Sequence, residues 1–473
     1  MNTELIKNKN TIIVLFWATG DLAKRKLFWA INELYKKNKN ITVISTGRKE
    51  FTNLEFQNYV KKETSSFIEQ DEEFNEFLSS IIYKKVEITN NKDYESLSDF
   101  IVDLNKENLQ IVFYLSIGYQ LFDIVIENLK IFNFENKEIK VIFEKPFWKD
   151  LQSAKELNKK INEVFLENQI YRIDHYVGKE SVQNILALRF WNILYEPIWN
   201  SHYIDNIQII AKEVLGVENR WEYYESSGAL RDMIQNHLFQ ILSLITMDVP
   251  ADISSDEISY EKLKILKEIK IKNNNVVFWQ YKNYQEELNV SKNSKTETFV
   301  AMKLEVNSWK FKDLPIYLKT WKKLNEKKTI IVIEFKEIPN IFYKKYGPIE
   351  NNKIIIEIQP EEKISILFNL KKKNNSKHIN SVKSEFKSLW KEKDSSYEKL
   401  ISDCIEGDKL LFIDWKILEK SWELVDNIVN CKEDCPLIHF YENWSNWPLE
   451  SEKLLEQDKR VWFDSQINYL NNI

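Results

Sequence analysis

The first 175 residues alternate short apolar segments with helical segments, and this alternation constrains the fold more than any other feature of the sequence. Residues 11–16, 41–46 and 110–117 are continuous apolar segments rich in β-branched side chains, which is the composition of buried strands. Residues 21–35, between the first two, have the apolar spacing of a helix. Strands that alternate with helices favour βαβ units, so we predict an α/β, Rossmann-like domain with a doubly wound parallel sheet over residues 1–175.

Residues 176–473 have a different pattern. Residues 178–192 and 226–246 are predicted to be helical, and further strands follow with few helices between them. Such strands favour a large, mostly antiparallel sheet with helices, and hence a second, α+β domain over residues 176–473. The polar residues 273–275 are expected to form a solvated loop. The strands of this domain are expected at residues 206–212, 298–306, 328–334, 353–359 and 363–368.

Charge and cysteine content exclude several classes of protein. The 473 residues carry a formal net charge of −5, which gives no sign of nucleic-acid binding or of a polybasic membrane anchor. No apolar segment approaches the roughly 18 residues of a membrane span. The three cysteines, Cys404, Cys431 and Cys435, are odd in number and lack zinc-ligand spacing. We therefore expect a reduced, cytoplasmic protein without a metal site.

The segment LFWATGDLAKRKL (residues 15–27) follows the first predicted strand, where a Rossmann fold keeps its phosphate-binding turn. Gly20 and Asp21 suit such a turn, but Trp17 stands at the first glycine position of the fingerprint. An ordinary strand–helix turn is therefore an alternative to a dinucleotide site. Arg48 follows the second strand and favours NADP over NAD, because an arginine there can bind a 2′-phosphate. An exposed basic turn is the alternative for Arg48.

The segment YRIDHYVGKE (residues 171–180) is dense in polar side chains. His175, Tyr176 and Lys179 supply three donors that could clamp a phosphate, one of them with a fixed charge. On local grounds a solvated polar turn accounts for this segment equally well.

The segment GALRDMIQNHLFQIL (residues 228–242) is predicted to be helical and contains Asp232 and His237. In an α-helix, five residues rotate the chain by about 500°, so these two side chains should lie about 140° apart rather than on one face. A histidine on a helix is more often a core or capping residue than a catalytic base, and both interpretations stay open here.

Seven stretches of the chain together resemble one family, glucose-6-phosphate dehydrogenase. They occur in the family's order and span nearly the whole chain. The stretches are ATGDLAKRKLF, EKPF, YRIDHYVGKESVQNILALRF, EPIWN, GALRDMIQNHLFQIL, SKTETFVAMKLEV and YEKLISDCIEGDKLLF. The resemblance implies oxidation of glucose 6-phosphate at C1 to 6-phosphogluconolactone, with hydride transfer to NADP, the first step of the oxidative pentose phosphate pathway. It also implies an NADP-binding first domain, a second domain for substrate binding and oligomerisation, and a homodimer or homotetramer.

The family pattern also implies roles for individual residues. His237 resembles the general base that takes the proton of the C1 hydroxyl, and Asp174 the carboxylate that orients it. Substrate contacts are implied for His175, Tyr176, Lys179, Glu213, Asp232, Lys322 and Lys327. Lys145 is implied to stand between substrate and coenzyme. Coenzyme contacts are implied for Trp17, Gly20, Asp21, Leu22, Arg48, Glu87 and Ile88.

Tryptophan replaces glycine at several positions of the family pattern. The chain has only 8 glycines but 15 tryptophans. One hypothesis accounts for both numbers: the source reads UGA codons as glycine, and the printed sequence translates them as tryptophan. If the tryptophans are genuine, the alternative is a catalytically impaired homologue that acts as a binding or scaffold subunit. The seven positions are Trp17, Trp148, Trp221, Trp279, Trp321, Trp444 and Trp447.

Overall fold

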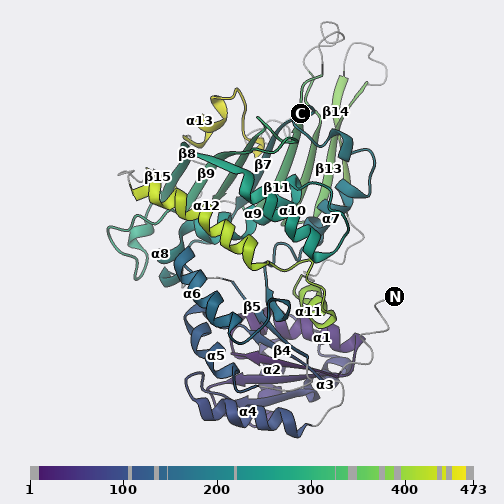
Figure 1. Ribbon diagram of the computed structural model, residues 1–473, viewed down its shortest axis with the longest axis vertical. Coiled ribbons are helices and arrows are strands. Elements are labelled where there is room, and N and C mark those ends of the chain that lie inside the picture. The colour runs from purple at the N-terminus through teal and green to yellow at the C-terminus, as the bar shows by residue number, and fades with distance from the viewer. Residues whose placement is uncertain are drawn as a thin grey trace. The chain divides into compact units, whose positions relative to one another are not determined.

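The computed structural model divides the chain into two compact units (Figure 1). The first unit comprises residues 1–178, 252–259 and 393–419, and the second comprises residues 179–251, 260–392 and 420–473. No helix among the described residues is long and apolar enough to cross a membrane. The structure describes residues 10–104, 109–132, 138–145, 148–217, 221–324, 326–338, 349–371, 379–387, 396–433, 439–443 and 450–464.

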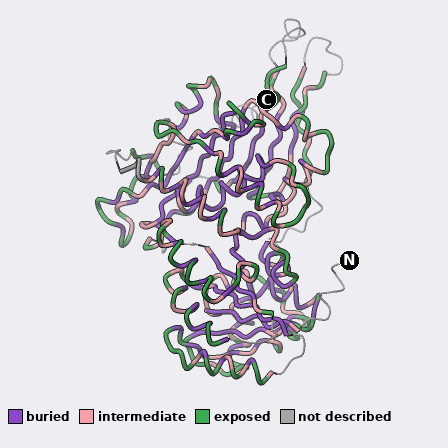
Figure 2. The backbone as a smooth tube through the Cα atoms, viewed as in Figure 1, coloured by how far each residue is buried: buried purple, intermediate pink, exposed green. Residues whose placement is uncertain are grey.

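The first unit is built on a six-stranded sheet in the order β3-β2-β1-β4-β5-β6, with every neighbouring pair parallel. This is the strand order of dinucleotide-binding folds. Strands β1 to β3 extend the sheet to one side and β4 to β6 extend it to the other, so the order of addition reverses between β1 and β4. The two central strands are buried along nearly their whole length, as their continuous apolar sequences predict (Figure 2). The strands are β1 (Asn10–Phe16), β2 (Ile41–Gly47), β3 (Ile81–Lys85), β4 (Leu109–Leu115), β5 (Glu138–Phe143) and β6 (Ile170–Arg172).

Four helices of the first unit begin at a polar side-chain cap: Thr52, Asp71, Asn90 and Asp150. Thr52 forms a capping box with Glu55 at the start of α2, and Asp150 accepts a hydrogen bond from the backbone N–H of Ser153 at the start of α6. The helices are η2 (Ala23–Leu27, a π-helix), α1 (Phe28–Lys37), α2 (Asn53–Glu63), α3 (Glu72–Ser79), α4 (Asn91–Asp103), η3 (Tyr119–Leu121), α5 (Phe122–Leu129), α6 (Leu151–Asn162) and η4 (Glu167–Gln169).

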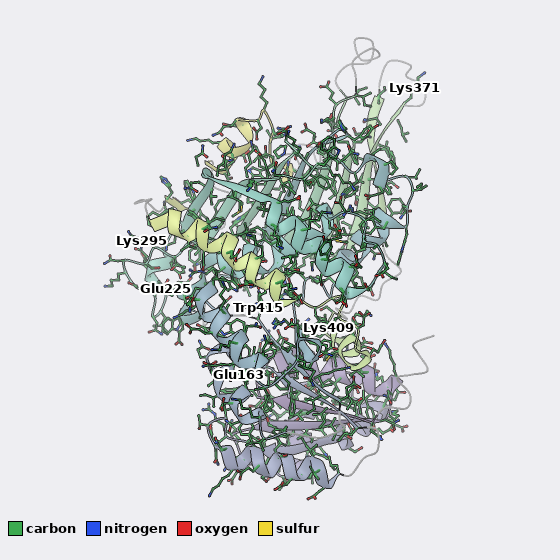
Figure 3. The ribbon with its side chains drawn as sticks, viewed as in Figure 1. Glu163, Glu225, Lys295, Lys371, Lys409 and Trp415 are labelled. Atoms are coloured by element: carbon green, nitrogen blue, oxygen red, sulfur yellow. The ribbon has the colours of Figure 1, made fainter. Side chains whose placement is uncertain are left out.

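A segment from late in the chain completes the first unit. Helix α11 (Ser396–Glu406) packs on the sheet, where the side chain of Lys140 donates to the carbonyl of Cys404 at 2.8 Å. Ile173 forms a β-bridge with Phe412, and the Trp415 N–H donates to Glu167 at 3.2 Å (Trp415 is labelled in Figure 3). The predicted second domain, residues 176–473, includes this segment, whereas the structure assigns residues 393–419 to the first unit. The sequence gives no local signal for this assignment, because it depends on contacts between residues far apart in the chain.

The second unit is built on a nine-stranded sheet in the order β14-β13-β12-β11-β7-β10-β9-β8-β15. Its described pairs are antiparallel, except that β7 pairs with β10 and β8 with β15 in parallel. The predicted combination of an α/β region and a mostly antiparallel α+β region is confirmed. The strands are β7 (Ile204–Lys212), β8 (Ile269–Tyr281), β9 (Phe299–Val306), β10 (Pro315–Trp321), β11 (Lys328–Phe335), β12 (Lys353–Gln359), β13 (Lys363–Lys371), β14 (Ile379–Lys387) and β15 (His439–Tyr441).

The predicted loop at residues 273–275 is wrong, because these residues lie within strand β8. Ile271 pairs with Leu304 and Val276 with Met302, so the polar residues between Ile271 and Val276 bulge out of the ladder. Their exposure explains why the sequence reads as a loop although the strand continues through it.

The predicted helix at residues 226–246 is three elements in the structure. Helix α8 (Trp221–Ala229) is interrupted at Gly228, which has a φ of 65° and a ψ of 179°. A Cβ at this glycine would lie 2.3 Å from a carboxylate oxygen of Glu297, so only glycine fits the bend. The π-helix η7 (Leu230–Leu238) and helix α9 (Phe239–Thr246) follow. The other helices of this unit are α7 (Glu180–Phe190), η5 (Glu196–Ile198), η8 (Tyr284–Glu286) and α13 (Glu450–Glu456), while α10 (Ser255–Glu268) and α12 (Trp415–Glu433) run across the boundaries of the units.

Candidate active site

Predicted site residues gather at the carboxyl ends of the strands in the first unit. Trp17 follows β1, Arg48 follows β2, Lys145 comes two residues after β5 and Asp174 two residues after β6. Since all six strands are parallel, these residues share one edge of the sheet, which is where open α/β folds bind their ligands.

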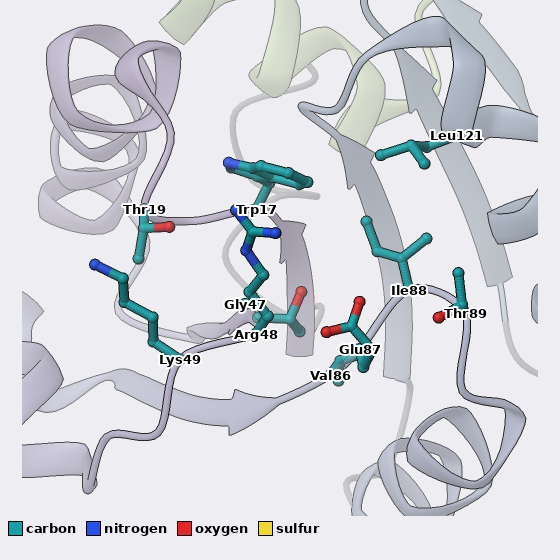
Figure 4. A pocket seen from close by; sticks show the side chains of 11 residues that line it. Trp17, Thr19, Gly47, Arg48, Lys49, Val86, Glu87, Ile88, Thr89 and Leu121 are labelled. Carbon is teal, nitrogen blue, oxygen red and sulfur yellow. The ribbon is translucent and has the colours of Figure 1, made fainter.

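A cavity lies at this edge, beside the first two strands (Figure 4). Four of the predicted coenzyme residues line it, whereas Gly20, Asp21 and Leu22 do not. Thr19, Lys49 and Leu121, which the resemblance does not mark, are also part of the wall. Its lining comprises Trp17, Thr19, Thr46, Gly47, Arg48, Lys49, Val86, Glu87, Ile88, Thr89 and Leu121.

Hydrogen bonds from neighbouring elements fix the walls of this cavity. The hydroxyl of Tyr83 donates to the carbonyls of Gly47 and Lys49, at 2.9 and 2.6 Å, and so orients the loop that carries Arg48. The Glu87 N–H donates to a carboxylate oxygen of Asp93 at 2.8 Å. Arg48 and Lys49 are two cations on one ordered loop, which suits the 2′-phosphate of NADP.

The three predicted residues outside the cavity shape the turn before it. The Gly20 N–H donates to the Trp17 carbonyl at 2.9 Å, and a Cβ on Gly20 would lie 3.0 Å from the Trp17 ring. Asp21 is exposed and pairs with Arg25 at 2.8 Å, and Leu22 packs against the hydrophobic core.

Trp17 does not fit a coenzyme pyrophosphate at this turn. Its indole lines the cavity, where Figure 4 shows it next to the Arg48 side chain. The Arg48 guanidinium lies over the indole, 5.4 Å from the ring centroid. The cavity has a volume of about 260 Å³, below the roughly 300–1,000 Å³ of most small-molecule sites. The cationic part of the site therefore fits NADP, whereas the side chain at position 17 occupies the space next to the phosphate-binding turn.

Lys145 follows a buried carboxyl group that the sequence analysis does not single out. The Tyr114 hydroxyl donates to Glu144 at 2.5 Å. Burial raises the pKa of Glu144 to about 7, although the Tyr114 hydrogen bond and the Lys145 charge oppose the shift. A charged residue that ends an apolar strand, as in VIFEKPF, is the signal that could have identified it.

Asp174 organises the turn that carries the predicted phosphate contacts. The Tyr176 N–H donates to an Asp174 carboxylate oxygen at 2.9 Å, and the Val177 N–H donates to the Asp174 carbonyl at 3.1 Å. The rings of His175 and Tyr176 lie 5.0 Å apart. Asp174 and Tyr176 are buried, and His175 is partly exposed.

Three predicted substrate residues meet in the second unit. The Lys322 ammonium pairs closely with Glu213 and lies 3.3 Å from an Asp232 carboxylate oxygen. The Tyr223 hydroxyl donates to the other Asp232 oxygen at 3.1 Å, and Lys322 lies over the Tyr224 ring at 5.0 Å. Lys322 and Asp232 are almost fully buried.

The sheet explains this cluster, because Glu213 and Lys322 each follow one of two adjacent parallel strands, β7 and β10. The Glu213 N–H donates to the carbonyl of Trp321 at 3.0 Å, which ties the two strand ends together. Lys327 is exposed and precedes β11, whose Lys328 is in register with Lys212 at the same end of the sheet.

The helix that carries Asp232 and His237 is a π-helix, so the predicted α-helical angle between them is wrong. In a π-helix the backbone N–H of residue i donates to the carbonyl of residue i−5, as the Phe239 N–H does to the Ile234 carbonyl. Residues five apart therefore lie close together on the helix surface. His237 is fully buried. The Leu230 N–H donates to Glu297 at 3.0 Å and so anchors the start of this helix.

Lys179 precedes helix α7 in the second unit. Its ammonium lies 3.9 Å from Glu362, and the Ser181 N–H donates to the same carboxylate at 2.6 Å. A carboxylate therefore occupies a position where a helix N-terminus and a lysine favour an anion. Sequence reasoning missed Glu362, Tyr223 and Glu297, because each acts through a contact distant in the sequence.

Two domain families of known proteins together match nearly the whole chain. The family described as "Glucose-6-phosphate dehydrogenase, NAD binding domain" matches residues 14–184, and "Glucose-6-phosphate dehydrogenase, C-terminal domain" matches residues 186–463. Glucose-6-phosphate 1-dehydrogenase of Bacillus subtilis (strain 168) is 38% identical over 96% of this chain and 98% of its own length. The enzyme of Chlamydia pneumoniae is also 38% identical, over 95% of each chain.

A solved structure described as glucose-6-phosphate dehydrogenase in complex with its substrate glucose-6-phosphate has a TM-score of 0.88 and 30% identity. The alignment covers 96% of this chain and 98% of that one. The resemblance stated from the sequence is thereby confirmed, and the chain belongs to the glucose-6-phosphate dehydrogenase family.

Proposed function

We propose that this protein oxidises glucose 6-phosphate at C1 to 6-phosphogluconolactone, as an NADP-dependent dehydrogenase. The observation that carries the proposal is a buried imidazole, His237, on the same π-helix as Asp232, whose carboxylate pairs with Lys322. A base beside a hydrogen-bonding cluster for sugar hydroxyls is what removal of a hydroxyl proton requires.

The charges of the second unit suggest how the sugar is bound. One ammonium, Lys322, lies against two carboxylates, Glu213 and Asp232. This cluster is net negative, so it suits neutral hydroxyl groups and disfavours a phosphate. We assign the phosphate to Lys179 with His175 and Tyr176, and a further basic contact to Lys327, as the family pattern implies.

The chemical step needs a proton acceptor at the C1 hydroxyl. His237 takes that proton as the C1–H bond breaks, and histidine is the side chain that most often serves as a general base. Asp174 is assigned to orient the imidazole and to stabilise its protonated form. When bound, the nicotinamide supplies the hydride acceptor. Arg48 would hold the 2′-phosphate, and Lys145 would stand between coenzyme and substrate.

The same proposal covers location and assembly. A single described cysteine side chain, Cys404, is buried and unbridged, which suits a reducing cytoplasm. We assign a homodimer or homotetramer, because the family pattern implies one.

The test measures NADPH absorbance with glucose 6-phosphate and NADP, in the enzyme isolated from its source and in a Trp17→Gly/Trp148→Gly variant. Turnover is expected with glucose 6-phosphate but not with glucose plus inorganic phosphate. The alternative, a catalytically impaired binding or scaffold subunit, predicts no turnover in either preparation. Turnover of another sugar phosphate in preference to glucose 6-phosphate would also overturn the proposed substrate.

A further inference from the structure

Two tryptophans have backbone conformations that side chains of their size rarely adopt. Trp17 has a φ of 60° and Trp148 a φ of 70°. The left-handed region costs most residues about 1–2 kcal/mol, and for a bulky residue it is an outlier. The other non-glycine residues in this region, within the part of the chain that the structure describes, are Asn283, Asn289, Asp313, Lys323 and Lys459. Among these residue types, asparagine and aspartate adopt it most readily.

The turn at Trp17 has the geometry that a glycine would serve. The Ala18 N–H donates to the Thr46 carbonyl at 2.9 Å, so the backbone leaves β1 in a fixed direction. The Gly20 N–H then closes the turn on the Trp17 carbonyl. In a dinucleotide-binding fold the first glycine allows this tight turn, and the backbone N–H groups beyond it bind the pyrophosphate. At position 17 both the φ angle and the occupied cavity therefore point to a residue without a side chain.

Trp148 lies at the same edge of the sheet, in the connection between β5 and α6. Its ring is buried against Phe122, with ring centroids 6.4 Å apart. Two of the strand–helix turns in this sheet thus hold a tryptophan with a positive φ. The described glycines with a positive φ are Gly228 and Gly407, and neither lies in such a turn.

Burial of the indole is a weaker marker than φ. The indole nitrogens of Trp279 and Trp321 are buried without a hydrogen-bond partner, but so is that of Trp422, which is not one of the seven positions where tryptophan replaces glycine. By contrast, Trp199 and Trp462 donate to backbone carbonyls at 2.8 and 2.9 Å. The structure therefore distinguishes positions 17 and 148, while Trp444 and Trp447 lie outside the described residues.

We infer that the functional protein carries glycine at positions 17 and 148, encoded by UGA codons that its source reads as glycine. UGA differs by one base from the glycine codon GGA, and some genetic codes read UGA as tryptophan. An average chain of this length would hold roughly 33 glycines, whereas this one has 8. The inference deepens the coenzyme site of the proposed function, and it rests on that function only for the identity of the ligand.

Peptide mass spectrometry of the protein from its source cells, together with the codons of its gene, tests the inference directly. Glycine and UGA are expected at positions 17 and 148. Trp199 and Trp462, whose indoles are hydrogen-bonded, are the matched controls and should read as tryptophan from UGG codons. Tryptophan at position 17 in the source protein, or a UGG codon there, would overturn the inference.

Coenzyme binding to the recombinant protein is the second test. The chain as printed is compared with Trp17→Gly, with Trp148→Gly and with the control Trp309→Gly, which changes a fully exposed residue outside the left-handed region. Trp17→Gly should tighten NADP binding by about 100-fold, the effect of one or two charge-assisted hydrogen bonds to phosphate. Trp148→Gly should change NADP binding less than Trp17→Gly does, because Trp148 does not line the cavity, and Trp309→Gly should leave NADP binding unchanged.

The two proposals fail separately. If the source protein has glycine at position 17 but does not turn over glucose 6-phosphate, the proposed function is wrong and this inference stands. If the source protein has tryptophan there and is active, this inference is wrong and the function stands. If the printed chain binds NADP as tightly as Trp17→Gly does, the steric part of the argument is overturned.

Discussion

The two units place their candidate site residues in the same way, but they differ in how the charged side chains are paired. In each unit, functional side chains follow the carboxyl ends of adjacent parallel strands: β1 and β2 in the first unit, and β7 and β10 in the second. In the first unit, Arg48 and Lys49 line a cavity, and Glu144 is buried against a phenol. In the second unit, Lys322 is held between two carboxylates. Parallel strand pairing thus builds both sites, while the charges decide which ligand each can hold.

The largest expected effect tests whether the second unit supplies the base. In the Trp17→Gly/Trp148→Gly variant, His237→Asn should lower kcat by about 10²–10⁴-fold, the usual contribution of a general base. The KM for glucose 6-phosphate should change little, because the sugar contacts remain. Steady-state kinetics measures both constants. The exposed His202→Asn is the control, and equal activity of the two variants would remove His237 from the mechanism.

The next effect tests the ion-pair cluster at the carboxyl ends of β7 and β10 in the second unit. Lys322→Met leaves Glu213 and Asp232 without their shared cation, and loss of one partner in a buried pair costs about 3–5 kcal/mol. We expect the free energy of unfolding to fall by that amount and the KM for glucose 6-phosphate to rise. Lys323→Met is the matched control, since Lys323 forms a more exposed pair with Glu287 and should lose no more than about 1 kcal/mol. Urea denaturation compares the two, and equal losses would contradict the buried cluster.

These two effects also show what the sequence could predict. Of the strands in the parallel sheet, β1, β2 and β4 could be recognised, because each is a continuous apolar run. Strand β10 was not expected, because Lys319 interrupts its pattern; this lysine is fully buried and pairs with Asp464, about 145 residues away in sequence. The meeting of Glu213 and Lys322 depends on β10 and so could not be derived from spacing. The π-helix also left no periodic signal, so the side-by-side positions of residues five apart were missed.

A smaller effect tests the buried carboxyl group of Glu144, at the carboxyl edge of the parallel sheet in the first unit. Glu144 has a pKa of about 7 in the folded protein, above its usual value of about 4.5, so folding stabilises its protonated form. This stability is full below pH 4.5 and is lost as the pH rises to about 7, a loss of about 3 kcal/mol at most. Glu144→Gln should abolish this pH dependence, because the amide oxygen can still accept from Tyr114.

The measurement is urea denaturation of the parent and of Glu144→Gln at pH 5 and pH 8. The control is Glu138→Gln, an exposed position at the opposite end of β5, which should keep the parent's pH dependence. If Glu144→Gln retains the full difference between pH 5 and pH 8, another group is responsible, and the first edge does not bury a protonated carboxyl.

The smallest effect tests whether the first edge selects its ligand by charge. In the Trp17→Gly/Trp148→Gly variant, Arg48→Gln should raise the KM for NADP by roughly 10–100-fold, since a charge-assisted hydrogen bond contributes about 1.5–3 kcal/mol. The KM for NAD should stay constant, because NAD has no 2′-phosphate. Arg25→Gln, which changes an exposed arginine outside the cavity, should alter neither constant. A parallel rise in the KM for both coenzymes would mean that Arg48 supports the fold of the loop. A rise in the KM for NADP alone would mean that the Arg48 charge selects the coenzyme. Lys322 differs from Arg48 in this respect, because its charge is already balanced by carboxylates within the protein.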